Sequence, residues 1–320
     1  MDYLLLFLLI IVTIVLGKTG TYFGLSEVVG QLLSGLFLGT SFLNIVHPND
    51  LIHLIAEIGV FLLMLNSGLD SDLKEMKKHV KNSSMIAGAG VLLPAVTFPI
   101  AFLALGYSMQ VSIFSGVVFS ATSISITLAV LAEQNKLATP MGAIILSAAV
   151  LDDIMALTAA TLFLIFIGGR TLGISNLLPL FAFALGLFLR KFNFSEVLGL
   201  MITKSGNCFF YPVFFGSIGL EVSVKSLNNK LLAVIIFSVL AIITKFYGSY
   251  MGAKLSGLNV NMSNAIGSGM ISRGEMALVI IQIGISSRIL NKDTSSEFIA
   301  AVIISTVVAP IIMKPLFKKV

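Results

Sequence analysis

Long apolar segments separated by short polar loops organise this chain. After a first segment at residues 1–25, they lie near residues 26–46, 51–69, 83–106, 110–133, 139–167, 175–189, 207–222, 231–256, 261–287 and 295–317. Most of them approach the length of about 20 apolar residues that a helix needs to cross a bilayer. None shows the strict alternation that is typical of membrane barrels. The pattern therefore predicts an all-α integral membrane protein with about 11 transmembrane helices.

The two halves of the chain share short motifs at a constant spacing of 151 residues. The matching positions are Gly35–Leu38 with Gly186–Leu189, Gly68–Asp70 with Gly219–Glu221, Ser112 with Ser263 and Gly116 with Gly267. Each half holds five apolar segments, and an odd number makes the second half enter the membrane from the opposite side. The sequence thus predicts two inverted five-helix repeats, residues 26–168 and 175–320, after an N-terminal transmembrane helix at residues 1–25.

Composition supports the membrane assignment and excludes several functions. The chain is 57% hydrophobic and 11% charged, whereas a soluble domain carries about 25% charged residues. The net charge of +5 resides mostly in loops between apolar segments, so it does not indicate a nucleic-acid partner. The sequence has no Ser/His/Asp set, metal-ligand set or nucleotide-binding loop, and Cys208 is its one cysteine. We expect neither an enzyme nor a bound cofactor.

The distribution of basic residues predicts the orientation, because inner loops are enriched in Lys and Arg. With the N-terminus outside and the C-terminus inside, the inner loops hold Lys18, Lys74, Lys77, Lys78, Lys81, Lys136, Arg190, Lys191, Lys204, Lys254, Lys314, Lys318 and Lys319. The outer loops then hold Arg170, Lys225, Lys230, Arg288 and Lys292. This excess of inner basic residues favours N-out, C-in.

Two adjacent carboxylates, Asp152 and Asp153, lie in the middle of an apolar segment. Each costs about 2.5 to 3.5 kcal/mol at the centre of a membrane helix. Lys245 lies at a similar depth in another segment. Adjacent helical residues point in different directions, so we expect one aspartate to pair with Lys245 and the other to face a water-filled cavity. A purely structural ion pair would explain one acid and the lysine, but not the second acid, which favours binding and release of a cation or a proton.

Two further segments carry glycine and hydroxyl residues where a membrane helix is normally apolar. They are Phe119–Thr127 and Gly267–Met276. Such composition suits helices that unwind halfway through the membrane and leave half-helix ends facing each other. Ordinary small-residue packing would account for the hydroxyls, but not for two charges in an apolar segment. The residues expected to act there are Thr122 and Ser123 along the ion path, Arg273 at a carbonyl end and Glu275 at an amide end.

At these residues the chain resembles the bacterial cation:proton antiporters of the NapA and Kef branch, and most closely the NapA-type sodium/proton antiporters. The similar stretches are Phe119–Thr127, Val130–Glu133, Ala148–Ile154, Pro212–Glu221, Thr244–Lys245, Arg273–Leu278 and His47 through Asp72. They follow the family order over nearly the whole chain. The resemblance implies an NhaA-like fold with discontinuous crossing helices, in the bacterial cytoplasmic membrane, and a role in pH homeostasis.

The resemblance also implies a role for each site residue. Asp153 matches the carboxylate that binds the cation and the proton, and Asp152 matches the carboxylate that pairs with the lysine, here Lys245. The other matches are Thr122 and Ser123 on the first crossing helix, and Arg273 and Glu275 as structural charges on the second. Family members with this set exchange about two protons per sodium and are therefore electrogenic.

The same resemblance implies a homodimer in which a core bundle moves against a scaffold. The core bundle would comprise approximately residues 83–167 and 231–320, and the scaffold approximately residues 1–72 and 175–222. One departure concerns two helices that the family usually carries between the two repeats. Here residues 168–175 would form only a short loop, which preserves the inverted topology but removes part of the link between bundle and scaffold.

Three hypotheses follow from these patterns. The first is an antiporter of Na⁺ or Li⁺ against H⁺. The second is a Kef-like K⁺/H⁺ efflux transporter, although the chain ends at Val320 without the nucleotide-binding domain that such systems usually add. The third is a transport-dead membrane scaffold, because two helices are missing. The expected partners are these cations, protons, the lipid bilayer and a second copy of the chain.

Overall fold

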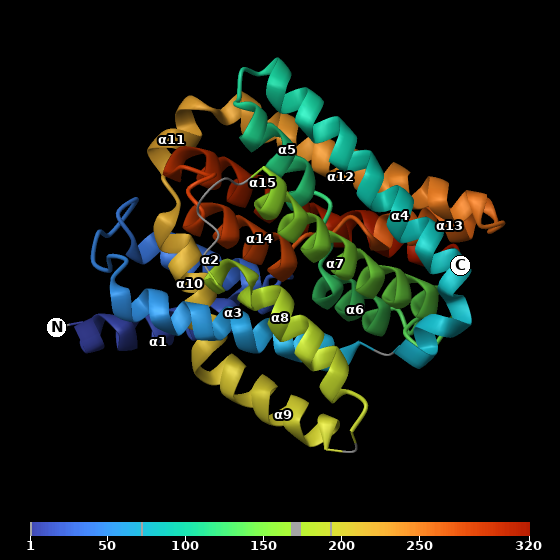
Figure 1. Ribbon diagram of the computed structural model, residues 1–320, viewed down its shortest axis with the longest axis horizontal. Helices are drawn as coiled ribbons and strands as arrows, with labels where there is room; N and C mark the ends of the chain where they lie inside the picture. The colour runs from blue at the N-terminus through green and yellow to red at the C-terminus, as the bar shows by residue number, and fades with distance from the viewer. Residues whose placement is uncertain (1, 72, 168–173, 193) are drawn as a thin grey trace. The chain divides into compact units, whose positions relative to one another are not determined.

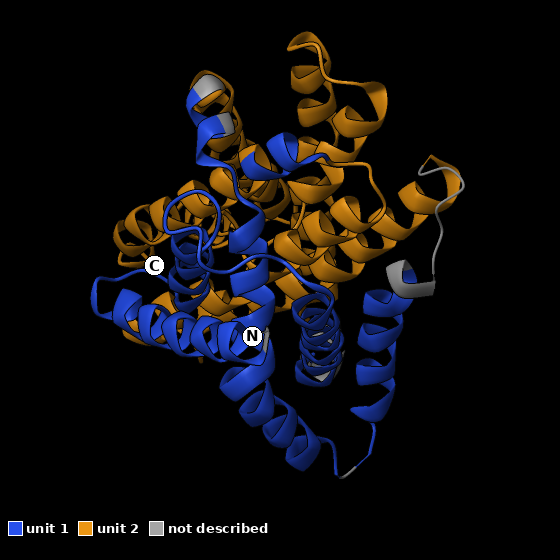
Figure 2. Ribbon diagram, turned by 90° about the vertical axis from the view of Figure 1, so that its left-hand side faces the viewer, with its two compact units in different colours: residues 1–71, 173–229, 291–296 blue, residues 72–172, 230–290, 297–320 orange. Residues whose placement is uncertain are grey.

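The protein is built from helices joined by short loops (Figure 1). The computed structural model describes residues 2–71, 73–167, 174–192 and 194–320, and no strand occurs among them. Two compact units divide the chain (Figure 2). Unit 1 comprises Met1–Ser71, Gly173–Asn229 and Asn291–Ser296, and unit 2 comprises Asp72–Leu172, Lys230–Leu290 and Glu297–Val320.

Unit 1 consists of helices that approach one another closely. It contains α1 (Asp2–Tyr22), α2 (Glu27–Leu38), α3 (Asp50–Asp70), α8 (Ile174–Leu189), α9 (Ser195–Ser205), the π-helix η1 (Gly206–Phe210), α10 (Tyr211–Glu221) and α11 (Val224–Asn229). Helix α2 packs on α10, and α3 packs on α8. An added Cβ at Gly219 would lie 2.9 Å from the Cα of Gly35, and one at Gly68 would lie 2.9 Å from the Cα of Gly186. Glycine at these crossings permits backbone-to-backbone contact, as in other membrane helix pairs.

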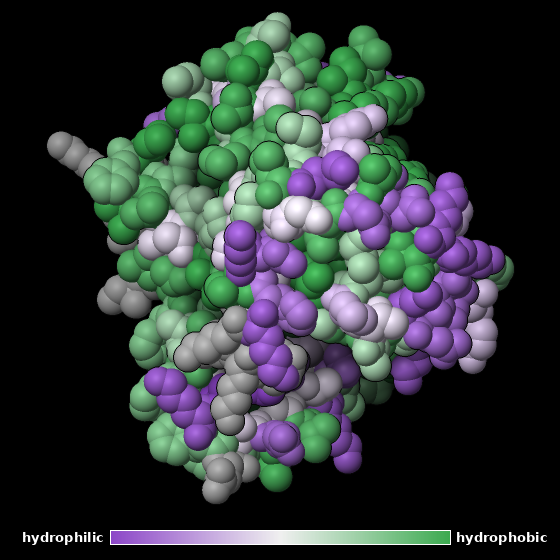
Figure 3. All heavy atoms as spheres, turned by 90° about the vertical axis from the view of Figure 1, so that its right-hand side faces the viewer, coloured by the Kyte–Doolittle hydropathy of each residue, from purple (hydrophilic) through white to green (hydrophobic). Residues whose placement is uncertain are grey.

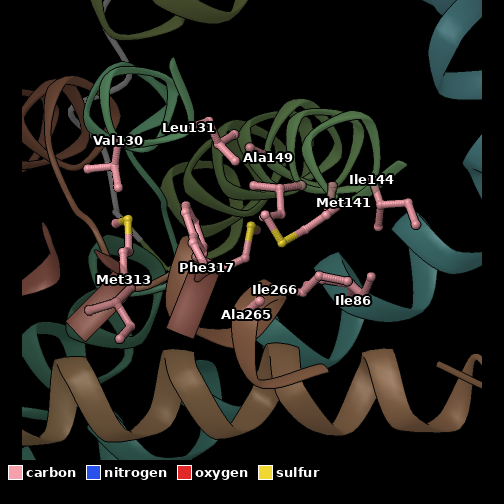
Figure 4. Packing of buried hydrophobic residues seen from close by; sticks show 14 of the residues in the cluster. Ile86, Val130, Leu131, Met141, Ile144, Ala149, Ala265, Ile266, Met313 and Phe317 are labelled. Carbon is pink, nitrogen blue, oxygen red and sulfur yellow. The ribbon is translucent and has the colours of Figure 1, made fainter. Parts of the chain in front are cut away.

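Unit 2 contains the longest helices. It comprises α4 (Leu73–Ala104), α5 (Met109–Val118), α6 (Ile124–Glu133), α7 (Pro140–Phe166), α12 (Leu231–Leu255), α13 (Val260–Gly269), α14 (Glu275–Ser286) and most of α15 (Lys292–Phe317). Helix α4 packs along both α12 and α7. Buried residues of six helices form one apolar cluster, shown in part in Figure 4. The labelled members are Ile86, Val130, Leu131, Met141, Ile144, Ala149, Ala265, Ile266, Met313 and Phe317.

Six described helices are long and apolar enough to cross a membrane. They are Tyr3–Tyr22, Asp50–Asp70, Lys78–Ala104, Pro140–Phe166, Leu231–Leu255 and Lys292–Phe317. Five shorter apolar helices of 10–17 residues also occur among the described residues. Figure 3 shows the side on which the C-terminus lies, where hydrophilic residues gather beside extensive hydrophobic surface. The total of about 11 crossings stays a prediction.

Three predicted segment boundaries are wrong. Helix α4 starts at Leu73 rather than near residue 83, because a helix rich in Lys, Glu and Met can continue into water beyond its apolar part. Helix α2 ends at Leu38, and residues 39–46 form turns instead of helix. Helix α9 and η1 occupy residues 195–210, most of which lie in the predicted loop, because their mixed composition conceals a helix that runs on into α10. The predicted loop at residues 168–175 lies largely outside the described residues.

Helix ends recur at the spacing that the motifs indicate. Helices α4 and α12 end 151 residues apart, and α5 and α13 begin and end at that same spacing. The loops that follow α4 and α12 each contain a glycine in the left-handed region, Gly106 with φ 85° and Gly257 with φ 92°. Equivalent sequence positions therefore adopt equivalent local structure in unit 2. The opposite membrane orientation of the two halves stays a prediction.

Candidate functional site

Two pairs of half-length helices form the centre of unit 2. Residues 119–123 interrupt the path from α5 to α6, and residues 270–274 interrupt the path from α13 to α14. A helix of ten residues is about 15 Å long, which is half of the roughly 30 Å hydrocarbon core. Each pair therefore matches one membrane thickness, with non-helical backbone midway.

The two non-helical segments hydrogen-bond to each other. The Ser123 N–H donates to the Ser272 carbonyl at 2.8 Å, and the Ser272 hydroxyl donates to the Ser123 carbonyl, also at 2.8 Å. The Thr127 hydroxyl donates to the Gly269 carbonyl at 2.7 Å. These bonds satisfy backbone groups that the helix breaks would otherwise leave unpaired inside the membrane. Gly274 makes the approach possible, since an added Cβ would lie 2.6 Å from the Ser123 Oγ.

Asp152 of α7 and Lys245 of α12 form an ion pair beside the break. Their Nζ and Oδ1 atoms are 2.5 Å apart, and both side chains are fully buried. The Lys245 ammonium also donates to the Ser120 carbonyl, and the Thr122 hydroxyl lies beside the Asp152 carboxylate. Each of the two charges thus has a partner of opposite charge and polar neighbours, which a buried charge requires.

Asp153 lies next in the chain, but in a different environment. It is 4% exposed, and within the described ranges its Oδ1 accepts no hydrogen bond and no basic side chain ion-pairs with it. The carboxylates of Asp152 and Glu275 add negative charge nearby. A buried carboxylate without a partner is unstable as an anion. This arrangement can gain free energy by binding either a proton or a small cation.

Arg273 stabilises the carbonyl end of the first break. Its guanidinium is fully buried and donates to the carbonyls of Ala121 and Ala241, both at 2.8 Å. It also lies over the Phe119 ring, 5.7 Å from the centroid. Phe119 in turn stacks on Phe98 of α4 at 4.2 Å. The charge and the stacked rings therefore hold the start of the non-helical segment in place.

Glu275 stabilises the amide end of the same break. It is the first residue of α14 and accepts hydrogen bonds from Ser123 at 2.9 Å and Ser125 at 2.7 Å, both at the start of α6. A carboxylate is favourable at the N-terminal end of a helix because the helix dipole is positive there. One acidic side chain thus serves the amide ends of two half-helices.

The structure brings all seven sequence-predicted site residues together in unit 2. They are Thr122, Ser123, Asp152, Asp153, Lys245, Arg273 and Glu275. Sequence reasoning missed Ser125, Ser272 and the carbonyl of Ser120, which are also hydrogen-bonded at the site. The run of hydroxyl residues was a visible signal, but it did not show which hydroxyl meets which partner.

Comparison with known proteins identifies the family. The sequence profile described as "Sodium/hydrogen exchanger, transmembrane" matches residues 5–190 and 157–319, almost the whole chain. The chain belongs to the sodium/hydrogen exchanger family. The predicted resemblance to cation:proton antiporters is thereby confirmed. Together with the six long apolar helices of the described ranges, membership identifies a multi-pass membrane protein.

Individual members of this family align with the chain along its length. A Na(+)/H(+) antiporter of Enterococcus hirae is 34% identical over 382 positions, covering 100% of this chain and 99% of that protein. The Na(+)/H(+)-K(+) antiporter GerN of Bacillus cereus is 26% identical, covering 97% and 95%. The first alignment is longer than this chain, so the Enterococcus protein has segments that this chain lacks.

A solved structure shows the shared fold. The sodium proton antiporter MjNhaP1 from Methanocaldococcus jannaschii superposes with a TM-score of 0.68, covering 98% of this chain and 95% of that chain. Its sequence is only 13% identical to this chain. The chain therefore shares its fold with a protein of very different sequence.

Proposed function

We propose that the protein is a secondary antiporter that exchanges a monovalent cation, Na⁺ or Li⁺, for protons across the bacterial cytoplasmic membrane. The observation that carries this proposal is Asp153, a buried carboxylate without a basic partner among the described residues, beside the paired Asp152. A cation and a proton cannot both occupy one carboxylate. Their competition couples the inward proton flux to the outward cation flux.

The oxygen atoms of the first helix break support the binding of a small hard cation. Such ions prefer oxygen ligands from carboxylates, carbonyls and hydroxyls. Thr122 and Ser123 supply hydroxyl and backbone oxygens in the non-helical segment. Lys245 neutralises Asp152, so the site presents one uncompensated carboxylate rather than two. In this proposal Arg273 and Glu275 do not bind the ion but hold the half-helix ends around it.

The architecture that we propose has two inverted repeats and about 11 crossings, with the N-terminus outside and the C-terminus inside. The recurrence of helix ends at 151 residues supports the repeats. We further propose a homodimer in which a core bundle, residues 83–167 and 231–320, moves against a scaffold, residues 1–72 and 175–222. The longer Enterococcus relative supports the loss of segments from this chain, which we assign to the interval at residues 168–175.

A test of this function is proton movement in everted vesicles from an antiporter-deficient bacterium. A pH-gradient dye reports the loss of the gradient when NaCl, LiCl or KCl is added. We expect dequenching with NaCl or LiCl for the wild type and none for Asp153→Ala, with both proteins present in the membrane at equal amounts. Full exchange by Asp153→Ala would contradict the role of this carboxylate, and an inactive wild type would favour a transport-dead scaffold.

Potassium/proton exchange is a second candidate. One relative that covers nearly the full chain is named a Na(+)/H(+)-K(+) antiporter, a name that includes potassium. The same vesicles distinguish the two functions, because dequenching by KCl without a response to NaCl would establish the potassium exchanger.

A further inference from the structure

Ser249 is a buried polar residue with no role in the ion site described above. It lies on α12, one turn beyond Lys245, and its side chain is fully buried. Its hydroxyl has no hydrogen-bond partner within the described part of the chain. A buried hydroxyl without a partner destabilises the fold, and such groups are rare. Ser249 is therefore a candidate for a role that requires a vacant acceptor in this conformation.

Gly90 of α4 shows that Ser249 and Lys245 face the same small space. An added Cβ at Gly90 would lie 2.6 Å from the Ser249 Oγ and 3.8 Å from the Lys245 Nζ. Residues four apart on a helix share one face, so both side chains project from α12 towards Gly90. An added Cβ would therefore crowd the Ser249 hydroxyl and make ordinary van der Waals contact with the Lys245 ammonium.

Lys245 has one more donor than it uses. An ammonium group carries three N–H bonds. Among the described residues, Lys245 donates to Asp152 and to the Ser120 carbonyl. An ammonium that leaves Asp152 inside the protein needs another acceptor, because a buried charge without hydrogen bonds is strongly unfavourable. The Ser249 oxygen is an unoccupied acceptor in the same space.

We propose that Ser249 is a positioning residue that accepts a hydrogen bond from the Lys245 ammonium when the ion pair with Asp152 opens. The inference rests on the proposed antiport, in which a cation arriving beside Asp153 repels the neighbouring ammonium. Because Gly90 has no side chain, the Lys245 ammonium and the Ser249 hydroxyl have space to meet beside it. Lys245 thus stays charged and hydrogen-bonded both beside Asp152 and beside Ser249, and its ion pair with Asp152 can open and form again in every cycle.

A stability cycle tests the contact without any transport. Ser249→Ala is made in the wild type and in Asp152→Asn, and the melting temperature of each purified protein is measured. We expect no fall in the wild type, because the hydroxyl has no partner there, and a fall of several degrees in Asp152→Asn, where Lys245 depends on Ser249. Ser238→Ala is the matched control. Ser238 is also buried on α12, but it donates to the Val234 carbonyl at 2.7 Å, so its effect should be equal in both backgrounds.

A transport arm tests the role in the cycle. At low sodium, the exchange rate of Ser249→Ala should fall about tenfold, the equivalent of one hydrogen bond to a charged group. The bond forms only when the cation is bound, so its loss should raise the half-saturating sodium concentration. Ser249→Thr keeps a hydroxyl and should restore most of the rate. Gly90→Ala should also lower the rate by displacing the Ser249 oxygen, with no further loss in the Gly90→Ala/Ser249→Ala double variant.

Two results would overturn the inference. One is an equal effect of Ser249→Ala on the melting temperature in both backgrounds, which would show that Lys245 does not reach the hydroxyl. The other is a wild-type exchange rate in Ser249→Ala, which would show that the hydroxyl is not used during exchange. A wild type without any exchange would refute the proposed antiport instead, and the stability cycle would still decide whether Ser249 accepts Lys245.

Discussion

At the scale of single residues, two identical side chains next to each other have different chemistry. Asp152 pairs with Lys245 at 2.5 Å, whereas Asp153 has no basic partner within the described ranges. The cause is the helix itself, which turns about 100° between neighbouring residues. One carboxylate is therefore directed to α12, and the other remains available for an ion or a proton.

Neutralising each aspartate should affect stability in opposite ways. Asp152→Asn leaves the Lys245 charge with a weaker partner and should destabilise the protein by about 3 kcal/mol, within the range measured for broken buried pairs. Asp153→Asn removes an unpartnered buried charge and should leave stability unchanged or raised, while abolishing exchange. Thermal unfolding of the purified variants, beside vesicle transport, measures both effects. Equal loss of stability in the two variants would contradict the assignment of the pair.

Competition at Asp153 predicts how sodium affinity depends on pH. A proton on this carboxylate excludes the cation, so the half-saturating sodium concentration should rise as pH falls. For one competing proton the rise is about tenfold per pH unit once the carboxyl group is mostly protonated. Vesicle exchange at several sodium concentrations and pH values provides the measurement. A half-saturating concentration that is independent of pH, with only the maximal rate changing, would exclude direct competition.

At the scale of helices, the site depends on two interruptions that support each other. The non-helical segments exchange hydrogen bonds through Ser123 and Ser272. Arg273 donates to the Ala121 carbonyl at one break, and Glu275 lies at the amide ends of two half-helices. Backbone groups that a continuous helix would satisfy internally are thereby satisfied between helices.

Gly274 should be sensitive to the smallest enlargement. An added Cβ would lie 2.6 Å from the Ser123 Oγ and 2.8 Å from its Cβ. Gly274→Ala should therefore separate the two segments, destabilise the protein by about 1–3 kcal/mol and lower the exchange rate. Gly88→Ala on α4 is the matched control, because no atom lies within 4 Å of its added Cβ. Melting temperature and vesicle exchange report both variants, and equal effects would contradict the close approach at Gly274.

At the scale of the whole molecule, the internal repeat appears in the contacts of each unit. In unit 1, Gly35 meets Gly219 and Gly68 meets Gly186, and each of these pairs maps onto the other at the spacing of 151 residues. In unit 2, a Cβ added to Gly116 would approach the Ala95 carbonyl, and a Cβ added to Gly267 would approach the Phe246 carbonyl. Ala95 and Phe246 are also 151 residues apart. Equivalent positions thus make equivalent contacts within each unit.

This equivalence predicts matched effects of substitution in unit 1. A Cβ added to Gly68 would lie 2.3 Å from the Phe183 carbonyl oxygen, and a Cβ added to Gly219 would lie 2.1 Å from the Leu32 carbonyl oxygen. Gly68→Ala and Gly219→Ala should therefore lower stability by similar amounts, about 1–3 kcal/mol each. Gly199→Ala, whose added Cβ meets only the Asn66 Oδ1 at 3.7 Å, is the control. Melting temperatures of the purified variants test this, and a loss confined to one of the two crossings would contradict the equivalence.

Electrogenic exchange gives a prediction for the complete transporter. If about two protons enter for each sodium ion, one net charge moves per cycle, worth about 2.3 kcal/mol per 100 mV. An imposed membrane potential, negative on the side to which protons move, should drive sodium against its gradient in proteoliposomes without a pH gradient. Sodium flux that ignores the potential would indicate electroneutral exchange.

How much of the site the sequence predicts depends on the type of signal. Asp152, Asp153, Lys245, Arg273 and Glu275 are visible because a charge in an apolar segment is costly and therefore rare. The hydroxyl partners are less visible, since Ser and Thr are common in membrane helices and most of them bond to their own backbone. Ser125 and Ser272 belong to that second group, so their contacts with Glu275 and Ser123 could not be predicted.

The sequence by itself determined the membrane class, the family, the spacing of the repeat and the location of the helix breaks. These properties depend on hydrophobicity and local composition, which can be read from neighbouring residues in the sequence. Only the tertiary structure decided which carbonyls Arg273 satisfies, which hydroxyls donate to Glu275 and where α9 continues into α10. Those outcomes depend on the rotation and approach of helices far apart in the sequence, and a small change in either exchanges one partner for another.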